Sequence, residues 1–426
     1  MLDLKLFREN PEVVKQNLER RKDKSRLKQV DEIIKLDNDW RRKKQEVDKL
    51  RAKRNDITSE VQKLKKSKKD VSSKIIEAQT VSEKLKESEE LMNFYKEKLD
   101  VLMKSMPNIM HESVPYGKDD SENVEVKKSG NIPKKDFKLK SHVELGEELA
   151  MLDFDKSAKL AGAGFYFLKG ELALLNQALI KFAIDHMIKK GYLYMETPLM
   201  MRKQPYEGVT DLSDFENVMY KIDEDDLYLI ATSEHPLVGQ YMNDVIDENE
   251  LPIKMCAYSM CFRREVGSRG IDTKGLFRTH QFNKVEQVVI CNPEESWDLH
   301  KEIVQNTEEF FQALELPYRI VNICTGDLGI VAAKKYDIEV WMPRQDKYAE
   351  VGSASNCTDY QARRLNLKYG KEGGEKFLVH TLNNTVVATS RALVAIMENN
   401  QNKDGSITIP KVLVPYMNGV KVIKKK

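Results

Sequence analysis

The chain has 426 residues, of which 32% are charged, and a formal net charge of +2. This length exceeds what one hydrophobic core usually organises, so two or more domains are expected, and the near-neutral total does not by itself indicate a nucleic-acid-binding protein. No apolar run approaches the ~20 residues that span a bilayer, and the five cysteines form no CxxC pair, which argues against a membrane anchor or disulfide framework and predicts a cytoplasmic protein with reduced thiols.

The N-terminal residues predict a short helix. Asn10, Pro11 and Glu12 supply a cap, a first-turn proline and an acidic first turn, and Val14 and Leu18 lie one turn apart on the same face.

Two heptad repeats follow. Apolar residues recur at alternating steps of three and four from Ile33 to Leu64, and again from Ala78 to Met106. The polar turn between them ends at Asp70, a candidate N-cap for the second helix. The pattern predicts an antiparallel helical hairpin, an arm of about 50 to 60 Å at the usual rise per residue.

Basic charge is concentrated in the first helix of this arm. Residues 40–69 contain 13 Lys or Arg against 4 Asp or Glu, a net charge of +9, so the remainder of the chain carries −7. Such a concentration favours contact with phosphates. Composition alone fits about equally well a solvated coiled coil that mediates dimerisation or binds a protein.

The residues after the arm predict a connector and then a mixed domain. Residues 107–133 are rich in Pro, Gly, Asn, Ser and Asp without periodicity, and we place a linker at 109–141 between an arm at 1–108 and a core at 142–426. A helix is expected over 171–190, and strands are expected over 192–198 and 227–234.

The stretch from Cys261 to Gln287 combines the residue types of a nucleotide site. It reads as two antiparallel strands joined by a Gly-rich loop, and it carries Arg263, Glu265, Arg278, Phe282 and Glu286, which are expected to face one pocket. Arginine forks bind phosphate or carboxylate, a phenyl ring can stack on a base, and a glutamate accepts from an ammonium or hydroxyl. For any single residue, a surface ion pair is the simpler interpretation.

The C-terminal third predicts a helix over 298–314, three strands, and a final strand that runs into a helix. Tyr348, Glu350 and Gly352 alternate along one strand, which places Glu350 beside the nucleotide pocket, and Arg391 lies at the start of the last helix.

Three motifs together resemble those of the seryl-tRNA synthetases, a family of class II aminoacyl-tRNA synthetases. FRREVGSRGIDTKGLFRTHQFNKVEQ resembles the family's second signature motif, Thr232-Ser233-Glu234 its serine-binding loop, and Glu350 to Ser353 with TLNNTVVATSR its third motif. The resemblance implies an α+β fold, an N-terminal coiled-coil arm on a core whose antiparallel β-sheet is flanked by helices. It also implies a homodimer formed through the helix and strand over 171–198.

The same resemblance implies a ligase. Such an enzyme activates L-serine with ATP to seryl-adenylate and transfers the seryl group to tRNA(Ser), which it holds through the arm at residues 40–100. The resemblance leaves open whether selenocysteine tRNA is also charged. Two alternatives remain: a relative that loads an amino acid onto a carrier protein, and a non-catalytic RNA-binding scaffold.

The resemblance further implies roles for individual residues. Arg263, Arg278 and Arg391 are the catalytic residues, because positioning and neutralisation of phosphate charge suffice for this chemistry. Mg²⁺ is expected on Glu350 and Ser353, and no zinc is expected because no Cys/His cluster has ligand spacing. The ATP site comprises Arg263, Arg264, Glu265, Arg278, Phe282, Glu350, Val351, Gly352, Ser353 and Arg391. The serine site comprises Thr232, Ser233, Glu234, Arg263, Glu286, Asn383 and Thr385.

One residue departs from the family pattern. Gly164 stands just before Phe165, where an arginine is expected. The role of that arginine is therefore in question in this chain.

Overall fold

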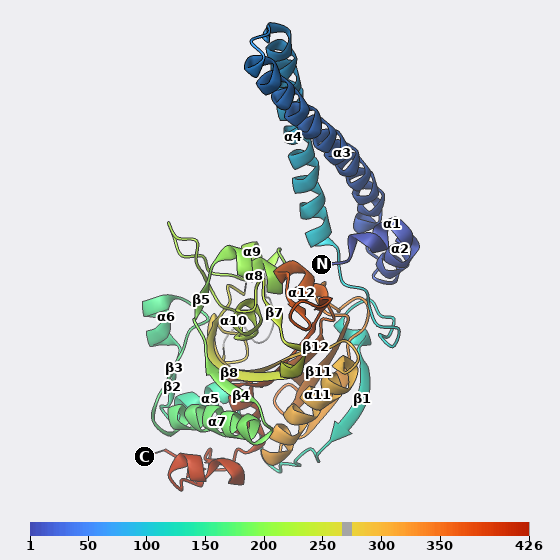
Figure 1. The fold of residues 1–426 in the computed structure, drawn as a ribbon. Coiled ribbons are helices and arrows are strands. Elements are labelled where there is room, and N and C mark those ends of the chain that lie inside the picture. The colour runs from blue at the N-terminus through green and yellow to red at the C-terminus, as the bar shows by residue number, and fades with distance from the viewer. Residues whose placement is uncertain (266–274, 426) are drawn as a thin grey trace. The chain divides into compact units, whose positions relative to one another are not determined.

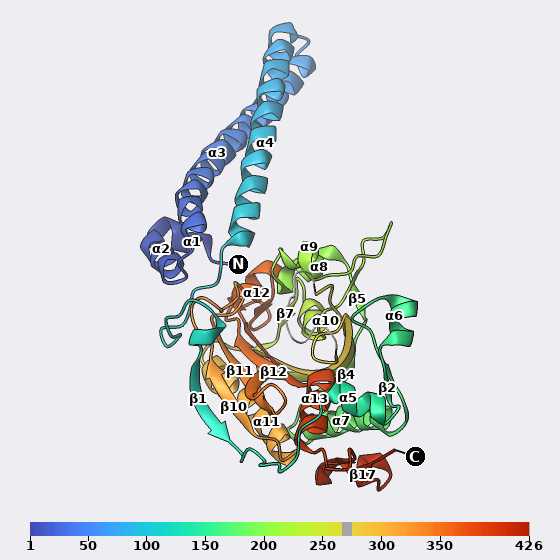
Figure 2. The same cartoon turned by 180° about the vertical axis from the view of Figure 1, so that it is seen from behind.

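A computed structural model of the chain describes residues 1–265 and 275–425. It divides into two compact units, Leu2–Met106 and Pro107–Lys426 with Met1, which are described separately (Figures 1 and 2). The Gly-rich loop predicted inside the Cys261–Gln287 stretch falls on 266–274, outside the described residues. The boundaries proposed at residues 108 and 141 stay predictions.

The N-terminal unit is the predicted helical hairpin. Its helices are α1 (Leu4–Glu9), α2 (Pro11–Arg20), α3 (Lys24–Lys66) and α4 (Ser72–Ser105). The short helix expected after Asn10 is confirmed as α2, with Pro11 in its first turn. Ion pairs join α3 to α4 at 2.7 to 3.0 Å: Arg51 to Glu89, Lys53 to Glu77 and Lys74 to Glu60.

The heptad repeats form the contact between the two long helices. Ile57 of α3 and Val81, Leu85 and Leu99 of α4 are among the buried side chains. The prediction for Asp70 is wrong by one residue, because the N-cap of α4 is Val71. The Asp70 carboxylate nevertheless accepts from the Ser72 backbone N–H at 3.0 Å, so it still satisfies a donor of the first turn.

The second unit is built on an eight-stranded sheet in the order β1-β10-β11-β12-β15-β9-β8-β4, and only β4 and β8 pair in parallel. Its strands are β1 (Val124–Ser129), β4 (Leu193–Glu196), β8 (Ile253–Phe262), β9 (Gln281–Cys291), β10 (Tyr318–Asn322), β11 (Lys334–Met342), β12 (Lys347–Asn356) and β15 (His380–Ala388). The predicted α+β class is thereby confirmed.

Helices cover both faces of this sheet. The larger core lies between the sheet and α7 (Gly170–Lys189), α11 (Ser296–Ala313) and α13 (Thr389–Asn399). A smaller core on the opposite face includes side chains of α8 (Lys203–Val209), α10 (Glu234–Gly239) and α12 (Tyr360–Leu365). Side chains alternate along β9. Those of Lys284, Glu286 and Val288 face the smaller core, whereas those of Val285 and Val289 pack in the larger core.

The remaining elements are short. They are α5 (His142–Glu148), α6 (Asp155–Ala161), α9 (Asp214–Asn217), the strands β2 (Leu152–Asp153), β3 (Phe167–Leu168), β5 (Met200–Met201), β6 (Tyr228–Leu229), β7 (Val245–Ile246), β13 (Lys368–Tyr369), β14 (Phe377–Leu378), β16 (Ile407–Thr408) and β17 (Val422–Ile423), and the 3-10 turns Asp120–Glu122, Glu248–Glu250, Lys411–Leu413 and Pro415–Met417. Within the described ranges, no helix is both long and apolar enough to cross a membrane.

Three sequence expectations differ from the structure. The connector contains β1, an edge strand that pairs with β10, whose exposed side chains gave little pattern to detect. Only Tyr228 and Leu229 of the strand expected over 227–234 are extended as β6, and α10 begins at Glu234. Arg263 and Glu265 do not share a strand face, because β8 ends at Phe262 and Glu265 has a φ of +46°.

Candidate active site

A cavity on the second face of the sheet gathers most of the residues predicted to bind ATP. Its lining comes from the end of β8, the segment before β9, the strands β9, β12 and β15, and the start of α13. The lining residues are Arg263, Glu265, Phe277, Arg278, Thr279, Phe282, Lys284, Glu350, Val351, Gly352, Thr385, Ala388, Ser390 and Arg391. Two predicted residues are outside this lining among the described residues, namely Ser353 and the exposed Arg264.

Arg391 contacts several residues of this cavity. It is the third residue of α13, and its Nη1 donates to the Glu350 carbonyl at 2.8 Å and lies 3.2 Å from the Glu350 carboxylate. Its Nε donates to the Phe277 carbonyl at 3.4 Å, and its guanidinium lies 4.8 Å from the centre of the Phe277 ring. Burial alone would raise the pKa of the Glu350 carboxyl, but the positive charges of Arg391, Lys335 and Arg263 outweigh it and lower that pKa.

A β-bulge in β12 sets the direction of Glu350 and Ser353. Glu350 pairs with Glu339 and Gly352 with Ile338, so Val351 is an extra residue on this strand. Residues three apart on a regular strand face opposite sides. The extra residue brings Glu350 and Ser353 to the same side, where both are partly exposed while Val351 is buried.

The two other predicted arginines differ in their surroundings. The Arg263 guanidinium lies 5.3 Å from the centre of the Phe282 ring, and its Nη2 lies 3.5 Å from the Ala231 carbonyl. Arg278 is exposed and pairs with Glu265 at 3.4 Å. An exposed pair of this length is weak, so a phosphate group can displace Glu265 from Arg278 at small cost.

A deeper polar cluster adjoins the cavity. Glu286 is buried and accepts from the Thr385 hydroxyl at 3.0 Å, and the Lys284 ammonium lies 2.9 Å from the same carboxylate. Thr385 is the cross-strand partner of Glu286, so the contact follows from the register of β15 with β9. Because Lys284 and Thr385 also line the cavity, the cluster and the cavity share a wall.

Glu234 occupies the other end of this cluster. Its Oε1 accepts from Asn383 Nδ2 at 3.0 Å and from Gln361 Nε2 at 2.9 Å. Burial, with the negative charge of Glu286 as a smaller cause, raises the pKa of the Glu234 carboxyl to about 7. The Thr232 hydroxyl accepts from the Glu234 backbone N–H at 3.3 Å, whereas the Ser233 hydroxyl points into the core and donates to the Ala257 carbonyl.

Several residues of the site were not predicted. Phe277 packs on Arg391, Lys284 pairs with Glu286, and Gln361 bonds to Glu234. Lys284 could have been found, since it lies two residues from Glu286 on the same strand face. Gln361 comes from α12 and gave no local signal.

Comparison with known proteins gives the family. The model of the seryl-tRNA synthetase N-terminal domain matches residues 1–110, and that of the tRNA synthetase class II core domain (G, H, P, S and T) matches 217–400. The serine–tRNA ligase of Methanocella arvoryzae is 52% identical over 99% of this chain and 100% of its own length. The chain belongs to the seryl-tRNA synthetase family.

Solved structures agree with this assignment. The seryl-tRNA synthetase of Pyrococcus horikoshii complexed with ATP is 47% identical with a TM-score of 0.93, and each chain is covered in full. The cytoplasmic serine–tRNA ligase of Naegleria fowleri in complex with AMP is 37% identical with a TM-score of 0.87, over 100% of this chain and 99% of the other. The predicted family and its ligase activity, the ATP-dependent attachment of serine to tRNA, are confirmed, which goes against the carrier-loading and scaffold alternatives.

The departure at Gly164 from the seryl-tRNA synthetase pattern has a structural explanation. Gly164 has a φ of +82°, and a Cβ on it would lie 2.3 Å from His280 Cδ2. The Gly164 carbonyl accepts from the His280 N–H at 2.9 Å, and His280 in turn pairs with Arg263, whose N–H donates to the His280 carbonyl at 2.9 Å. The absence of a side chain at Gly164 thus allows His280, the backbone partner of Arg263, to pack closely against this position.

We expect Gly164→Ala to destabilise the protein by about 1 to 3 kcal/mol and to lower its activity, because both the backbone conformation and the contact with His280 oppose a Cβ. Gly162→Ala is the matched control, since Gly162 also has a positive φ, of +91°, but a Cβ there meets nothing within 4 Å. Chemical unfolding of both variants tests the difference. Equal losses would mean that the contact with His280 is unimportant.

We expect Glu234→Gln to stabilise the protein at high pH. The folded pKa is about 7 against an ordinary 4.5, so the folded state keeps a proton that the unfolded state releases, and wild-type stability falls as pH rises from about 4.5 to about 7. The variant should gain about 1 to 3 kcal/mol at pH 8 and little at pH 5 in denaturant titrations. Glu302→Gln, which removes a carboxylate paired with Lys254 at 2.8 Å, should gain nothing at pH 8. A Glu234→Gln gain that is the same at both pH values would contradict the assigned cause.

Proposed function

We propose that the cavity holds ATP and that the adjoining cluster holds L-serine, so that the serine carboxylate attacks the α-phosphorus. A bond forms between a carboxylate oxygen and phosphorus, the bond to the bridging oxygen breaks, and pyrophosphate leaves with the electron pair. A ribose hydroxyl of tRNA then attacks the seryl carbonyl and AMP leaves. The observation that carries this proposal is that Lys284 and Thr385 belong both to the lining of the cavity and to the polar cluster around Glu286.

The arginines supply positive charge where phosphate charge develops. Arg263 lies between the cavity and Ala231, next to the Thr232 loop, which supports its contact with both the α-phosphate and the serine carboxylate. Arg391 is held by carbonyl oxygens from two sides, so it is preorganised for the base and terminal phosphates. Phe282 supplies a ring face for the base, and Arg278 reaches the terminal phosphates after release from Glu265.

Glu350 and Ser353 are suited to hold Mg²⁺. A carboxylate oxygen and a hydroxyl oxygen are ligands that this ion accepts, and it commonly uses one or two protein ligands together with substrate phosphates. The bulge at Val351 places both residues on one side of β12, and the lowered pKa of Glu350 keeps its carboxylate ionised. When bound, the ion would neutralise phosphate charge beside Arg391.

Serine is selected by buried polar groups that are suited to a hydroxyl and an ammonium. The Glu286 carboxylate with Thr385 is suited to the substrate hydroxyl, and Glu234 with Asn383 and Thr232 is suited to the ammonium. Alanine would lack the additional donor that the serine hydroxyl offers to the buried Glu286 carboxylate, a loss of about 1 to 3 kcal/mol.

A homodimer is supported by an apolar surface on α7 and β4. Leu174 and Ile188 of α7 are 47% and 50% exposed, and Leu193 on the edge strand β4 is 62% exposed. Exposed apolar residues gathered beside a free strand edge favour association with a second copy. We further propose that the dimer acts in the cytoplasm, consistent with five buried free cysteines.

Exchange of labelled pyrophosphate into ATP tests the activation step. We expect exchange that depends on serine and falls by a factor of about 10² or more in Arg263→Ala, because a charged contact to the reacting phosphate is lost. Arg319→Ala is the control, since Arg319 pairs with Glu339 and Glu125 and is not among the residues that line the cavity. Exchange independent of serine, or an unaffected Arg263→Ala variant, would refute the proposal.

Removal of positive charge from α3 tests the role of the arm. The triple change Lys49→Gln, Arg54→Gln and Lys63→Gln replaces exposed basic residues of α3. We expect the KM for tRNA to rise about tenfold or more and its salt dependence to weaken, with pyrophosphate exchange unchanged.

The same loss of charge on α4 is the matched control. Lys84→Gln, Lys86→Gln and Lys98→Gln remove three exposed lysines there, and their effect on the KM should be smaller. Equal effects would show that the total charge of the arm matters rather than the charge of α3, and loss of exchange would give the arm another role.

A further inference from the structure

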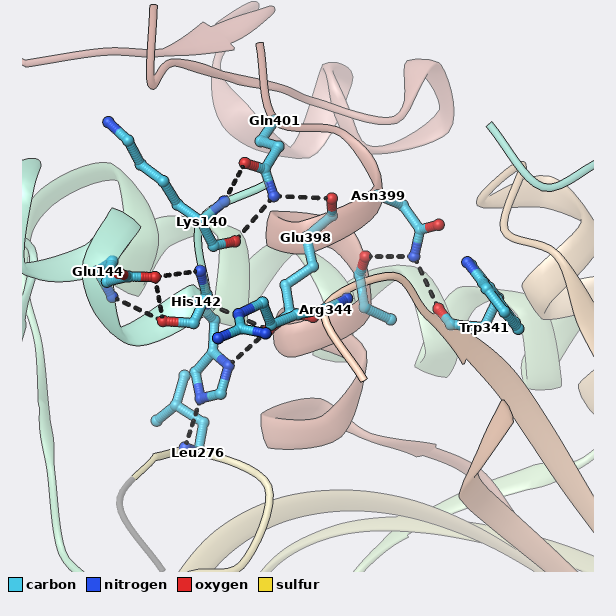
Figure 3. A network of polar contacts seen from close by, with 11 residues as sticks. Lys140, His142, Glu144, Leu276, Trp341, Arg344, Glu398, Asn399 and Gln401 are labelled. Atoms are coloured by element: carbon cyan, nitrogen blue, oxygen red, sulfur yellow. Dashed lines mark hydrogen bonds and ion pairs between the residues drawn. The ribbon is translucent and has the colours of Figure 1, made fainter. Parts of the chain in front are cut away.

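A buried histidine links the ATP cavity to the far end of α13. His142 is the first residue of α5, and Figure 3 shows it between Glu398 and Leu276. Its Nδ1 lies 2.9 Å from Glu398 Oε1, and its Nε2 lies 3.1 Å from the Leu276 backbone N. His142 and Glu398 are 6% and 2% exposed, so water cannot replace either partner freely.

The hydrogen-bonding pattern fixes the tautomer of this ring. A backbone N–H only donates, so Nε2 must accept from Leu276 and the proton must be on Nδ1, where it is donated to Glu398. The Glu398 carboxylate is fully engaged, because Oε1 also accepts from the His142 N–H at 3.2 Å and Oε2 accepts from the Arg344 N–H at 3.3 Å. The ring is therefore held in one orientation, with a single acceptor aimed at Leu276.

Gly275 permits the segment from Gly275 to Arg278 to approach the His142 ring closely. It has a φ of +148°, and a Cβ on it would lie 2.5 Å from His142 Nε2. Any other residue would push the segment away from the acceptor.

The helix α13 holds this segment at two consecutive residues. Arg391 in its first turn donates to the Phe277 carbonyl, and Glu398, seven residues later, holds Leu276 through His142. Seven residues correspond to about 10 Å along the helix. The positions of the Phe277 ring and of Arg278 in the cavity therefore depend on two sets of hydrogen bonds. One runs directly from Arg391 at the start of α13, and the other runs from Glu398 near its end through His142.

We propose that His142 is a positioning residue for ATP: its bond to the Leu276 N–H holds Phe277 and Arg278 in the geometry that receives the nucleotide. His142 does not line the ATP cavity and has no part in the chemical step. The inference rests on the proposed function of the cavity.

Two substitutions separate the two bonds of the ring. In His142→Gln the side-chain oxygen lies near the position of Nε2 and can accept from Leu276, whereas in His142→Asn the side-chain nitrogen lies near Nδ1 and can donate only to Glu398. We expect His142→Asn to raise the KM for ATP in pyrophosphate exchange about fivefold, with the KM for serine changed less than about twofold. His142→Gln should restore most of the affinity for ATP.

A purely structural role predicts a different result. Such a role would lower the unfolding temperature of His142→Asn and of His142→Gln, and the KM for ATP would either stay unchanged or rise equally in the two variants. Either outcome overturns the proposal. Glu398→Gln, which retains an acceptor for Nδ1, provides a milder variant should His142→Asn fail to fold, and we expect it to raise the KM for ATP about twofold with no change for serine. Unchanged ATP affinity in Glu398→Gln would also overturn the proposal.

His380→Gln is the control, because His380 Nδ1 contacts Ser296 Oγ at 2.8 Å on a different part of the sheet. Its KM for ATP should equal that of the wild type. Failure of this inference is distinguishable from failure of the proposed function: wild-type exchange that does not require serine refutes the function, whereas serine-dependent exchange with unaltered ATP affinity in the His142 variants refutes only the role of His142.

Discussion

The side chain of Arg391 connects stretches of the chain that are distant in sequence. Its guanidinium contacts Glu350 in β12 and Phe277 before β9, while its backbone belongs to the first turn of α13. A partly buried guanidinium needs acceptors for its donors, and the two backbone carbonyls and the Glu350 carboxylate supply them. The cavity takes its shape from this requirement, because the same contacts that satisfy Arg391 fix the wall formed by Phe277 and Glu350.

Two carboxylates of the site, Glu350 and Glu234, meet opposite electrostatic surroundings. Glu350 is flanked by the positive charges of Arg391, Lys335 and Arg263, which lower its pKa, whereas Glu234 is bonded to the neutral amides of Asn383 and Gln361, and burial raises its pKa to about 7. A phosphate and metal site benefits from a carboxylate that is always ionised. A carboxylate that becomes ionised when an ammonium arrives couples substrate binding to proton release.

The sequence best predicted the helices and strands whose formation depends on neighbouring residues in the chain. The heptad repeats gave α3 and α4, and the proline after Asn10 gave α2. The predicted positions of Phe282 and Glu286 on one strand face agree with β9, since both are at even positions of the same strand.

What the sequence missed depends on contacts between distant segments. The edge strand β1 is exposed along most of its length and is fixed only by pairing with β10. The end of β8 before Arg263 and the packing of Phe277 on Arg391 depend on the cavity itself. Gln361 comes to the polar cluster around Glu234 from α12 because the smaller core packs that helix against the sheet.

The extra residue in β12 has a consequence for how this strand can vary. Side-chain direction alternates along a regular strand, and the extra residue at Val351 offsets this alternation once between Glu350 and Ser353. Another apolar residue in place of Val351 would preserve the arrangement. Deletion of Val351 would leave Glu350 and Ser353 two residues apart on a regular strand, still on the same side, but would remove a buried side chain from the larger core. A homologue without the extra residue would therefore keep both oxygens on one side, but it would have to fill the volume of the Val351 side chain from another element.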